Sequence, residues 1–237
     1  ALAPAHVKNF TISDVIGDDL GSIGSGPCVP DASSAAEVRA LLETAGLWMR
    51  VPAPLRDHLE AVQRGTLAET PKPGDPAFRT TDVHLIASNR LALEAVCARA
   101  QVLGMEAHLV DSAMAGEASE AGRRLASALL GYDGTQLSAT QVIGTNNHAI
   151  AVWGGETTVT LGTNPGLGGR SQELALAAGG VLERGTRPDG RAVYLLAAGT
   201  DGRDGPTDAA GGFADAGTWA AIRAAGRDPG KDLANHE

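Results

Sequence analysis

Carboxylates, glycines and two arginines gather in three short loops, and these residue types could do chemistry. The first loop, Ser13–Asp19, places Asp14, Asp18 and Asp19 within six positions. Three carboxylates this close repel one another unless a cation or a set of hydrogen-bond donors compensates them. The loop therefore indicates either Mg²⁺ or a hydrogen-bonded hydroxyl substrate. An ordinary acidic turn is the alternative.

The second loop, 164–173, brings glycines up to the expected start of a helix. Gly166, Gly168 and Gly169 precede Arg170. Backbone N–H groups at a helix N-terminus, together with the positive end of the helix dipole, favour an anion. The guanidinium fork of an arginine suits phosphate or carboxylate. The loop predicts an anion site, and a flexible connector with a solvated arginine is the alternative.

The third loop, Gly199–Asp208, contains Asp201, Asp204 and Asp208. Their spacing differs from the calcium-loop pattern D-x-[DN]-x-[DN]-G, and no Glu follows at the twelfth position. The aspartates indicate a metal or substrate loop, whereas turn propensity alone could also account for the Asp-Gly pairs.

Each of these loops follows an expected strand, the place where α/β proteins bind ligands. Three prolines between Thr70 and Pro76 predict a linker or surface loop. Strand and helix patterns alternate beyond it, which is typical of a βαβ unit in a parallel sheet. We therefore expect an α/β fold with parallel or mixed sheets flanked by helices. The expected strands are Val7–Val15, Val83–Ala87, Ala107–Val110, one or two within 140–153, Thr157–Leu161 after a turn at Gly154–Gly155, and Ala192–Ala198 after a hairpin-like turn at Thr186–Gly190. The expected helices are Ala35–Ala45, Pro54–Arg64, Asn89–Leu103, Ala115–Leu130, Arg170–Leu182 and Ala216–Ala225.

Composition excludes several classes of protein. The 237 residues are enough for one large or two small domains, and their net charge of −9 argues against nucleic acid, because such binders need a basic face. We find no run of 18 apolar residues and no signal-peptide pattern, so we expect a cytoplasmic protein with no membrane partner. Cys28 and Cys97 have no CxxC partner, which favours small core residues in a reducing compartment.

Several well-known motifs are absent from the sequence. Without G-x-x-x-x-G-K-[ST], a Walker-type nucleotide site is excluded in this chain. A G-x-G-x-x-G after a strand is also missing, which weakens a dinucleotide interpretation, and the lack of G-x-S-x-G counts against an α/β-hydrolase. Among the histidines, only His148 follows an expected strand closely enough to reach a site.

With the three loops in view, the chain resembles the glycerate 2-kinase family that carries the MOFRL domain, whose members are often labelled hydroxypyruvate reductases. Five stretches occur in the family's order and span nearly the whole chain. They are Ile12–Val15 with Gly17–Asp19 and Ser25–Pro27, then Ala87–Ala95, Gly154–Val159, Gly168–Leu176, and Gly199–Gly202 continuing through Gly205–Gly211.

The resemblance implies ATP-dependent phosphoryl transfer to the 2-hydroxyl of D-glycerate, giving 2-phosphoglycerate, in a cleft between two α/β domains. ATP and Mg²⁺ are the implied cofactors. The implied organisation is the end of an N-terminal α/β region with the ligand loop 13–27 and a linker over 1–78, a βαβ segment over 79–148, and a MOFRL-type C-terminal domain over 149–237 that lacks its end.

Site residues follow from the same resemblance. The catalytic assignments are Asp14 and Arg170, and Asp201 is the candidate metal ligand. Arg170 and the 166–169 backbone would hold phosphate or the glycerate carboxylate, while Asp14 or Asp201 would orient the hydroxyl or hold Mg²⁺. The substrate-binding assignments are Ser25, Glu156, Gly168, Gly169 and Glu173.

Members of the resembled family carry a further upstream region with an active-site lysine, so we expect this chain to be the middle and C-terminal part of a longer enzyme. An NAD(P)H-dependent hydroxypyruvate reductase is the first alternative function. A non-catalytic module that binds a small ligand is the second. The sequence is compatible with a homodimer.

Overall fold

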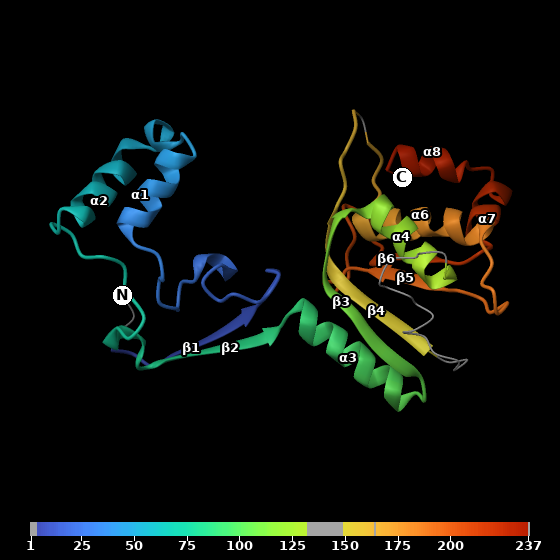
Figure 1. The fold of residues 1–237 in the computed structure, drawn as a ribbon, viewed down its shortest axis with the longest axis horizontal. Coiled ribbons are helices and arrows are strands. Elements are labelled where there is room, and N and C mark those ends of the chain that lie inside the picture. Colours follow the sequence, from blue (N-terminus) through green and yellow to red (C-terminus); the bar gives the residue numbers. More distant parts are fainter. Residues whose placement is uncertain (1–3, 132–148, 164, 237) are drawn as a thin grey trace. The chain divides into compact units, whose positions relative to one another are not determined.

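The computed structural model of the chain describes residues 4–131, 149–163 and 165–236 (Figure 1). The chain forms two compact units, Ala1–Ser88 and Asn89–Glu237. Helices are mixed with parallel strand pairs, so the expected α/β class is confirmed. Within the described residues, no helix is both long enough and apolar enough to cross a bilayer.

The first unit pairs two parallel strands and packs two helices beside each other. Its elements are β1 (Val7–Ile12), η1 (Ile23–Ser25), α1 (Ala35–Thr44), η2 (Trp48–Arg50), α2 (Ala53–Gln63), η3 (Pro76–Phe78) and β2 (Thr81–Ala87). Strands β1 and β2 are in register from Val7 opposite Thr81 onward. The helices pack through Ala35, Leu59 and Val62. Both expected helices are confirmed to within a residue or two at their ends.

The first strand is shorter than expected. It ends at Ile12, where the pairing with β2 shifts register. Beyond it, the backbone N–H of Ser13 still donates to the carbonyl of Ala87 at 2.9 Å, but the Ser13 hydroxyl bonds the main chain of Val15 and starts a turn. A serine side chain that bonds the backbone two residues on competes with strand pairing, so 13–15 leaves the sheet.

The second unit builds on a parallel pair, β3 with β4, and its elements run from α3 to α8. They are α3 (Asn89–Val102), β3 (Glu106–Glu117), α4 (Ala118–Leu130), β4 (Ala149–Thr158), α6 (Arg170–Arg184), β5 (Leu195–Ala198), β6 (Gly211–Ala214), α7 (Thr218–Ala224) and α8 (Pro229–Ala234). Among the described residues, the strands on either side of α3 belong to different pairs, because β2 pairs with β1 and β3 pairs with β4. His148 lies outside the described residues.

Two expected features after residue 150 are wrong. Gly154 and Gly155 do not turn the chain but lie inside β4. A Cβ at Gly155, whose φ is +144°, would lie 2.0 Å from the carbonyl oxygen of Met114, so glycine here permits close strand contact. Thr157–Leu161 is not a separate strand, because β4 ends at Thr158 and Thr160 instead donates to the Glu117 carboxylate.

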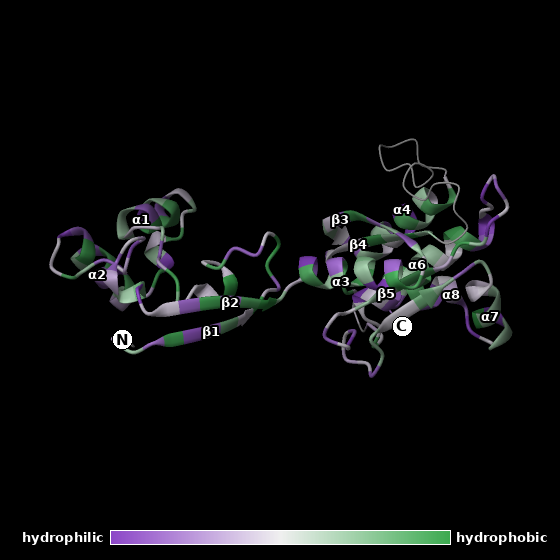
Figure 2. Cartoon of the chain, turned by 90° about the horizontal axis from the view of Figure 1, so that it is seen from below, coloured by the Kyte–Doolittle hydropathy of each residue, from purple (hydrophilic) through white to green (hydrophobic). Residues whose placement is uncertain are grey.

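Helix α6 is the centre of the core in the second unit. It lies side by side with α4, and apolar residues make up much of both helices (Figure 2). A Cβ at Gly122 would lie 2.1 Å from the carbonyl oxygen of Leu174, so the two backbones nearly touch. Below α6, the antiparallel pair β5 and β6 contributes Leu195 and Ala214 to the same core. As a result, the buried residues of α6 extend from Ser171 to Leu182.

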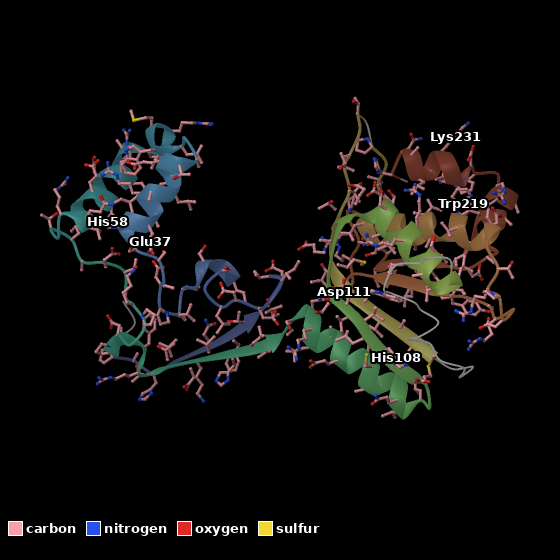
Figure 3. The ribbon with its side chains drawn as sticks, viewed as in Figure 1. Glu37, His58, His108, Asp111, Trp219 and Lys231 are labelled. Atoms are coloured by element: carbon pink, nitrogen blue, oxygen red, sulfur yellow. The ribbon has the colours of Figure 1, made fainter. Side chains whose placement is uncertain are left out.

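Two short helices close the C-terminal side of the unit. Trp219 lies on α7 (Figure 3). Its indole N–H donates to the carbonyl of Leu176 at 2.8 Å. Its ring lies over Gly179 and Gly180, where a Cβ would come within 2.5 Å to 3.2 Å of ring atoms. Sequence reasoning predicted α7 but missed β6 and α8. The segment 186–190 follows α6 and not a strand, so it is not a hairpin turn.

Candidate active site at the start of α6

The second and third loops meet at the N-terminus of α6. The side chain of Asp204 is buried there, and its residue is only 2% exposed. Its Oδ1 accepts the backbone N–H of Ser171 at 2.9 Å, and its Oδ2 accepts that of Gln172 at 2.7 Å. The chain's own carboxylate therefore lies where the loop sequence predicted an external anion.

Glycines permit this close approach of the two loops. A Cβ at Gly169 would lie 2.3 Å from the Cγ of Asp204. Gly205 has a φ of +61°, and a Cβ there would lie 3.1 Å from the Cα of Gly169. A side chain at either position would push the loops apart. These two glycines are thus needed for contact between loops.

The other glycine amides of the second loop are also used within the chain. Gly166 donates to the carbonyl of Asn235 at 2.7 Å, and Gly168 donates to that of His236 at 2.8 Å. The 166–169 backbone was expected to hold phosphate or carboxylate. In this conformation, two of its N–H groups are bonded to the 235–236 backbone, so a ligand would have to displace those contacts.

The guanidinium of Arg170 lies at the surface beside Glu156. Its Nη1 donates to Oε1 of Glu156 at 2.6 Å, from the first residue of α6 to a residue of β4. The two side chains are 49% and 53% exposed. Ion pairs this exposed contribute about 0–1 kcal/mol to stability, and a cation at a helix N-terminus opposes the dipole. Folding stability therefore does not account for an arginine at this position. Binding of a negatively charged ligand would account for it.

Glu173 has an internal partner. Its Oε2 lies 2.8 Å from Nδ1 of His236, and the two side chains are only 6% and 13% exposed. This buried contact between a carboxylate and an imidazole joins α6 to the C-terminal segment at His236. This position is less suited to direct contact with a substrate than the half-exposed Glu156.

Asp201 lies in the exposed part of the third loop. Its Oδ1 accepts the backbone N–H of Arg203 at 3.2 Å. Among the described residues, no three His, Cys, Asp or Glu side chains are grouped so that they could hold a metal ion. Mg²⁺ is usually held by one or two carboxylates with substrate phosphates and water. The exposed carboxylate of Asp201 fits that role.

The acidic loop of the first unit does not form a carboxylate cluster. Asp14 is exposed two residues beyond the end of β1. Asp19 instead makes a local turn, since its Oδ2 accepts the hydroxyl of Ser22 at 2.6 Å. That hydrogen bond, assisted by backbone N–H groups, lowers the pKa of Asp19 below its ordinary value. Asp14 therefore differs from Asp19, because the carboxylate of Asp14 takes no part in the turn that Asp19 forms with Ser22.

Ser25 stands in an unusual backbone conformation. Gly24, Ser25 and Gly26 have φ values of +56°, +62° and +60°, which is a run of three left-handed residues. For a residue with a side chain, this region costs about 1–2 kcal/mol. Such strain persists only where the surroundings enforce it, and it clusters at ligand sites. Exposed Ser25 thus keeps its candidate substrate-binding role.

Sequence reasoning missed two residues of this site. Asp204 was seen only as one aspartate among several in its loop, and His236 was assigned no role. Neither residue is near α6 in sequence, because Asp204 is 33 positions from Ser171 and His236 is 63 from Glu173. The Asp204-Gly205 pair was the available signal, since a glycine beside a buried carboxylate permits close loop contact.

Comparison with known proteins assigns this part of the chain. Residues 149–237 match the MOFRL family over a continuous stretch. Residues 1–60 match a domain of unknown function, DUF4147. The resemblance inferred from the motifs is thereby confirmed, and the MOFRL region contains the Arg170–Glu156 pair, Glu173, Asp201 and Asp204.

Relatives of the chain have names that agree with this family. It is 39% identical over 228 residues to a glycerate 2-kinase of Pyrococcus horikoshii, covering 95% of this chain and 48% of the relative. It is 36% identical over 236 residues to a D-glycerate 2-kinase of Thermotoga maritima, covering 99% and 50%. Other relatives are named hydroxypyruvate reductase.

A solved structure supports the fold. The crystal structure of a glycerate kinase from Thermotoga maritima matches with a TM-score of 0.76 at 34% identity, covering all of this chain and 51% of that one. The chain thus spans about half the length of the relatives that it matches.

Proposed function

We propose that the protein to which this chain belongs transfers the γ-phosphoryl group of ATP to the 2-hydroxyl of D-glycerate. The products are 2-phosphoglycerate and ADP. The observation that carries the proposal is the half-exposed Arg170 guanidinium at the start of α6, paired at 2.6 Å with Glu156 inside the MOFRL region. The names of the relatives support the same substrate.

Arg170 would act by charge compensation. In phosphoryl transfer, catalysis rests on positioning and on stabilising charge at the phosphoryl oxygens. The guanidinium would exchange its bond to Glu156 for bonds to the γ-phosphate or to the glycerate carboxylate. Glu156 holds the guanidinium in place before the ligand arrives, so little rearrangement is needed.

Asp14 would act on the acceptor. The 2-hydroxyl oxygen of glycerate forms a bond to the γ-phosphorus while the bond to the bridging oxygen of ADP breaks, and the hydroxyl proton passes to a carboxylate. Asp14 lies just beyond the end of β1 in the region that matches DUF4147, and its exposed carboxylate is our candidate for accepting that proton. The exposed side chain of Ser25 is our candidate for contact with the substrate. Mg²⁺, when bound, would neutralise phosphate charge, with Asp201 as a ligand.

A coupled assay on the full-length protein tests the proposal. We expect ADP release that requires both D-glycerate and Mg²⁺. If ADP is not released but hydroxypyruvate drives NAD(P)H consumption, the reductase is correct instead, as the names of some relatives would suggest. If calorimetry shows binding of glycerate or ATP without turnover of either kind, the protein is a ligand-binding module.

A further inference from the structure

We infer that Asp204 is a positioning residue, which fastens the loop of Asp201 to the start of α6 and so fixes Asp201 relative to Arg170. The contacts themselves are independent of any reaction. The expected effect on turnover rests on the proposed function.

The first support is the way in which both oxygens of the carboxylate are used. Each accepts one backbone N–H from the first turn of α6, at 2.9 Å and 2.7 Å. The first N–H groups of a helix have no partner within it, and a carboxylate satisfies them with charge-assisted bonds at the positive end of the dipole. At 2% exposure, Asp204 cannot also reach a substrate in solution. It therefore acts through other residues.

The second support is a closed set of bonds around Asp204. The Gln172 side-chain amide donates to the hydroxyl of Thr207 at 2.9 Å, and that hydroxyl donates to the carbonyl of Asp204 at 2.7 Å. The backbone N–H of Asp204 donates to the carbonyl of Ala209 at 2.8 Å. Loop 204–209 is thus folded on itself and joined to Gln172, so that moving the carboxylate would move the whole loop.

The third support is the placement of the two functional side chains relative to this anchor. Arg170 directly precedes Ser171, whose N–H the anchor holds, and Asp201 lies three residues before Asp204 in the same loop. The Asp204 side chain lies so close to Gly169 that a Cβ at this glycine would be 2.3 Å from its Cγ. If the carboxylate is removed, the start of α6 and the loop of Asp201 are no longer joined by its hydrogen bonds. The distance between Arg170 and Asp201 is then no longer fixed, although neither residue is changed.

The experiment uses the full-length protein with Asp204→Asn and Asp204→Ala. A matched control is Asp215→Asn, since Asp215 accepts the N–H of Gly217 at 2.8 Å at the start of α7. Three quantities are measured: hydrogen exchange at the amides of Ser171 and Gln172, kcat and KM for both substrates, and the response of Asp204→Ala to sodium formate with sodium chloride as the reference.

We expect Asp204→Asn to raise exchange at both amides at least tenfold and to lower kcat at least tenfold, with a change of less than threefold in KM for glycerate. Formate should restore part of the activity of Asp204→Ala, because it can occupy the vacated position, whereas chloride should not. The Asp215→Asn control should keep wild-type exchange and kcat. If Asp204→Ala does not fold, Asp204→Asn decides.

Two results would overturn the inference. One is wild-type exchange at Ser171 and Gln172 in Asp204→Asn. The other is increased exchange in that variant together with wild-type kcat, which would make the anchor irrelevant to turnover. If the wild-type protein proves inactive on glycerate, the proposed function fails, while the exchange data still show whether Asp204 holds the loop.

Discussion

Helices α1 and α6 differ in where the backbone N–H groups of their first turn find hydrogen-bond acceptors. At α1, the hydroxyl of Ser34 accepts the N–H of Glu37 at 3.2 Å, and the Glu37 carboxylate accepts the N–H of Ser34 at 2.8 Å. At α6, the capping position is Gly169, which has no side chain, and Asp204 supplies the acceptors from a distant loop. A local cap stabilises one helix, whereas a distant cap also joins two parts of the molecule.

The most severe way to break the distant cap is to fill the space that admits it. Gly169→Ala places a Cβ 2.3 Å from the Cγ of Asp204 and 2.5 Å from its carbonyl carbon. We expect a loss of about 1–3 kcal/mol in the free energy of unfolding, as for overpacked sites, measured by urea denaturation. Gly162→Ala is the control, because a Cβ there meets nothing within 4 Å. Equal stability of the two variants would contradict the tight contact.

The next prediction separates charge at the start of α6 from charge at the end of α2. Arg170→Ala should lower kcat/KM of the full-length protein at least tenfold, about 1.4 kcal/mol of transition-state stabilisation. Its free energy of unfolding should change by less than about 1 kcal/mol, as for an exposed ion pair. Steady-state kinetics and urea denaturation measure the two effects.

Arg64→Ala is the control for that substitution. Arg64 also forms an exposed pair, with Glu60 at 3.3 Å on α2. We expect its kcat/KM to remain at the wild-type value. Should Arg170→Ala behave like Arg64→Ala, the guanidinium of Arg170 is only a solvated surface charge.

The same contrast explains what the sequence could and could not predict. The Ser34 cap and the α1 boundaries follow from neighbouring residues, and so does the exposed Arg170 after its glycines. The position of Asp204 does not, because its partners are more than 30 positions away. Gly154 and Gly155 also misled the prediction, since a glycine that admits a neighbouring backbone looks in sequence like a glycine that turns the chain.

The local cap offers a smaller test. Ser34→Ala removes the acceptor for the N–H of Glu37, and we expect a loss of about 1 kcal/mol in the free energy of unfolding, together with wild-type kcat. Thr44→Ala is the control at the other end of α1, since the exposed Thr44 hydroxyl donates to the carbonyl of Ala40 and does not cap the start of the helix. A fall in kcat in Ser34→Ala would show that a local cap can also govern turnover, and would remove the distinction drawn between the two helix starts.

The smallest effect is a titration just before α1. Hydrogen bonds from the hydroxyls of Ser33 and Thr70 lower the pKa of Asp31 to about 2. Because the folded pKa lies below the ordinary value, ionised Asp31 contributes stability above about pH 4, and this contribution is lost as the pH falls toward 2. The ¹³C shift of the Asp31 carboxyl should titrate near pH 2 in the wild type and closer to its ordinary value in Thr70→Ala. An unchanged midpoint would mean that Thr70 does not hold this carboxylate, and that Ser33 and Lys72 are sufficient to lower its pKa.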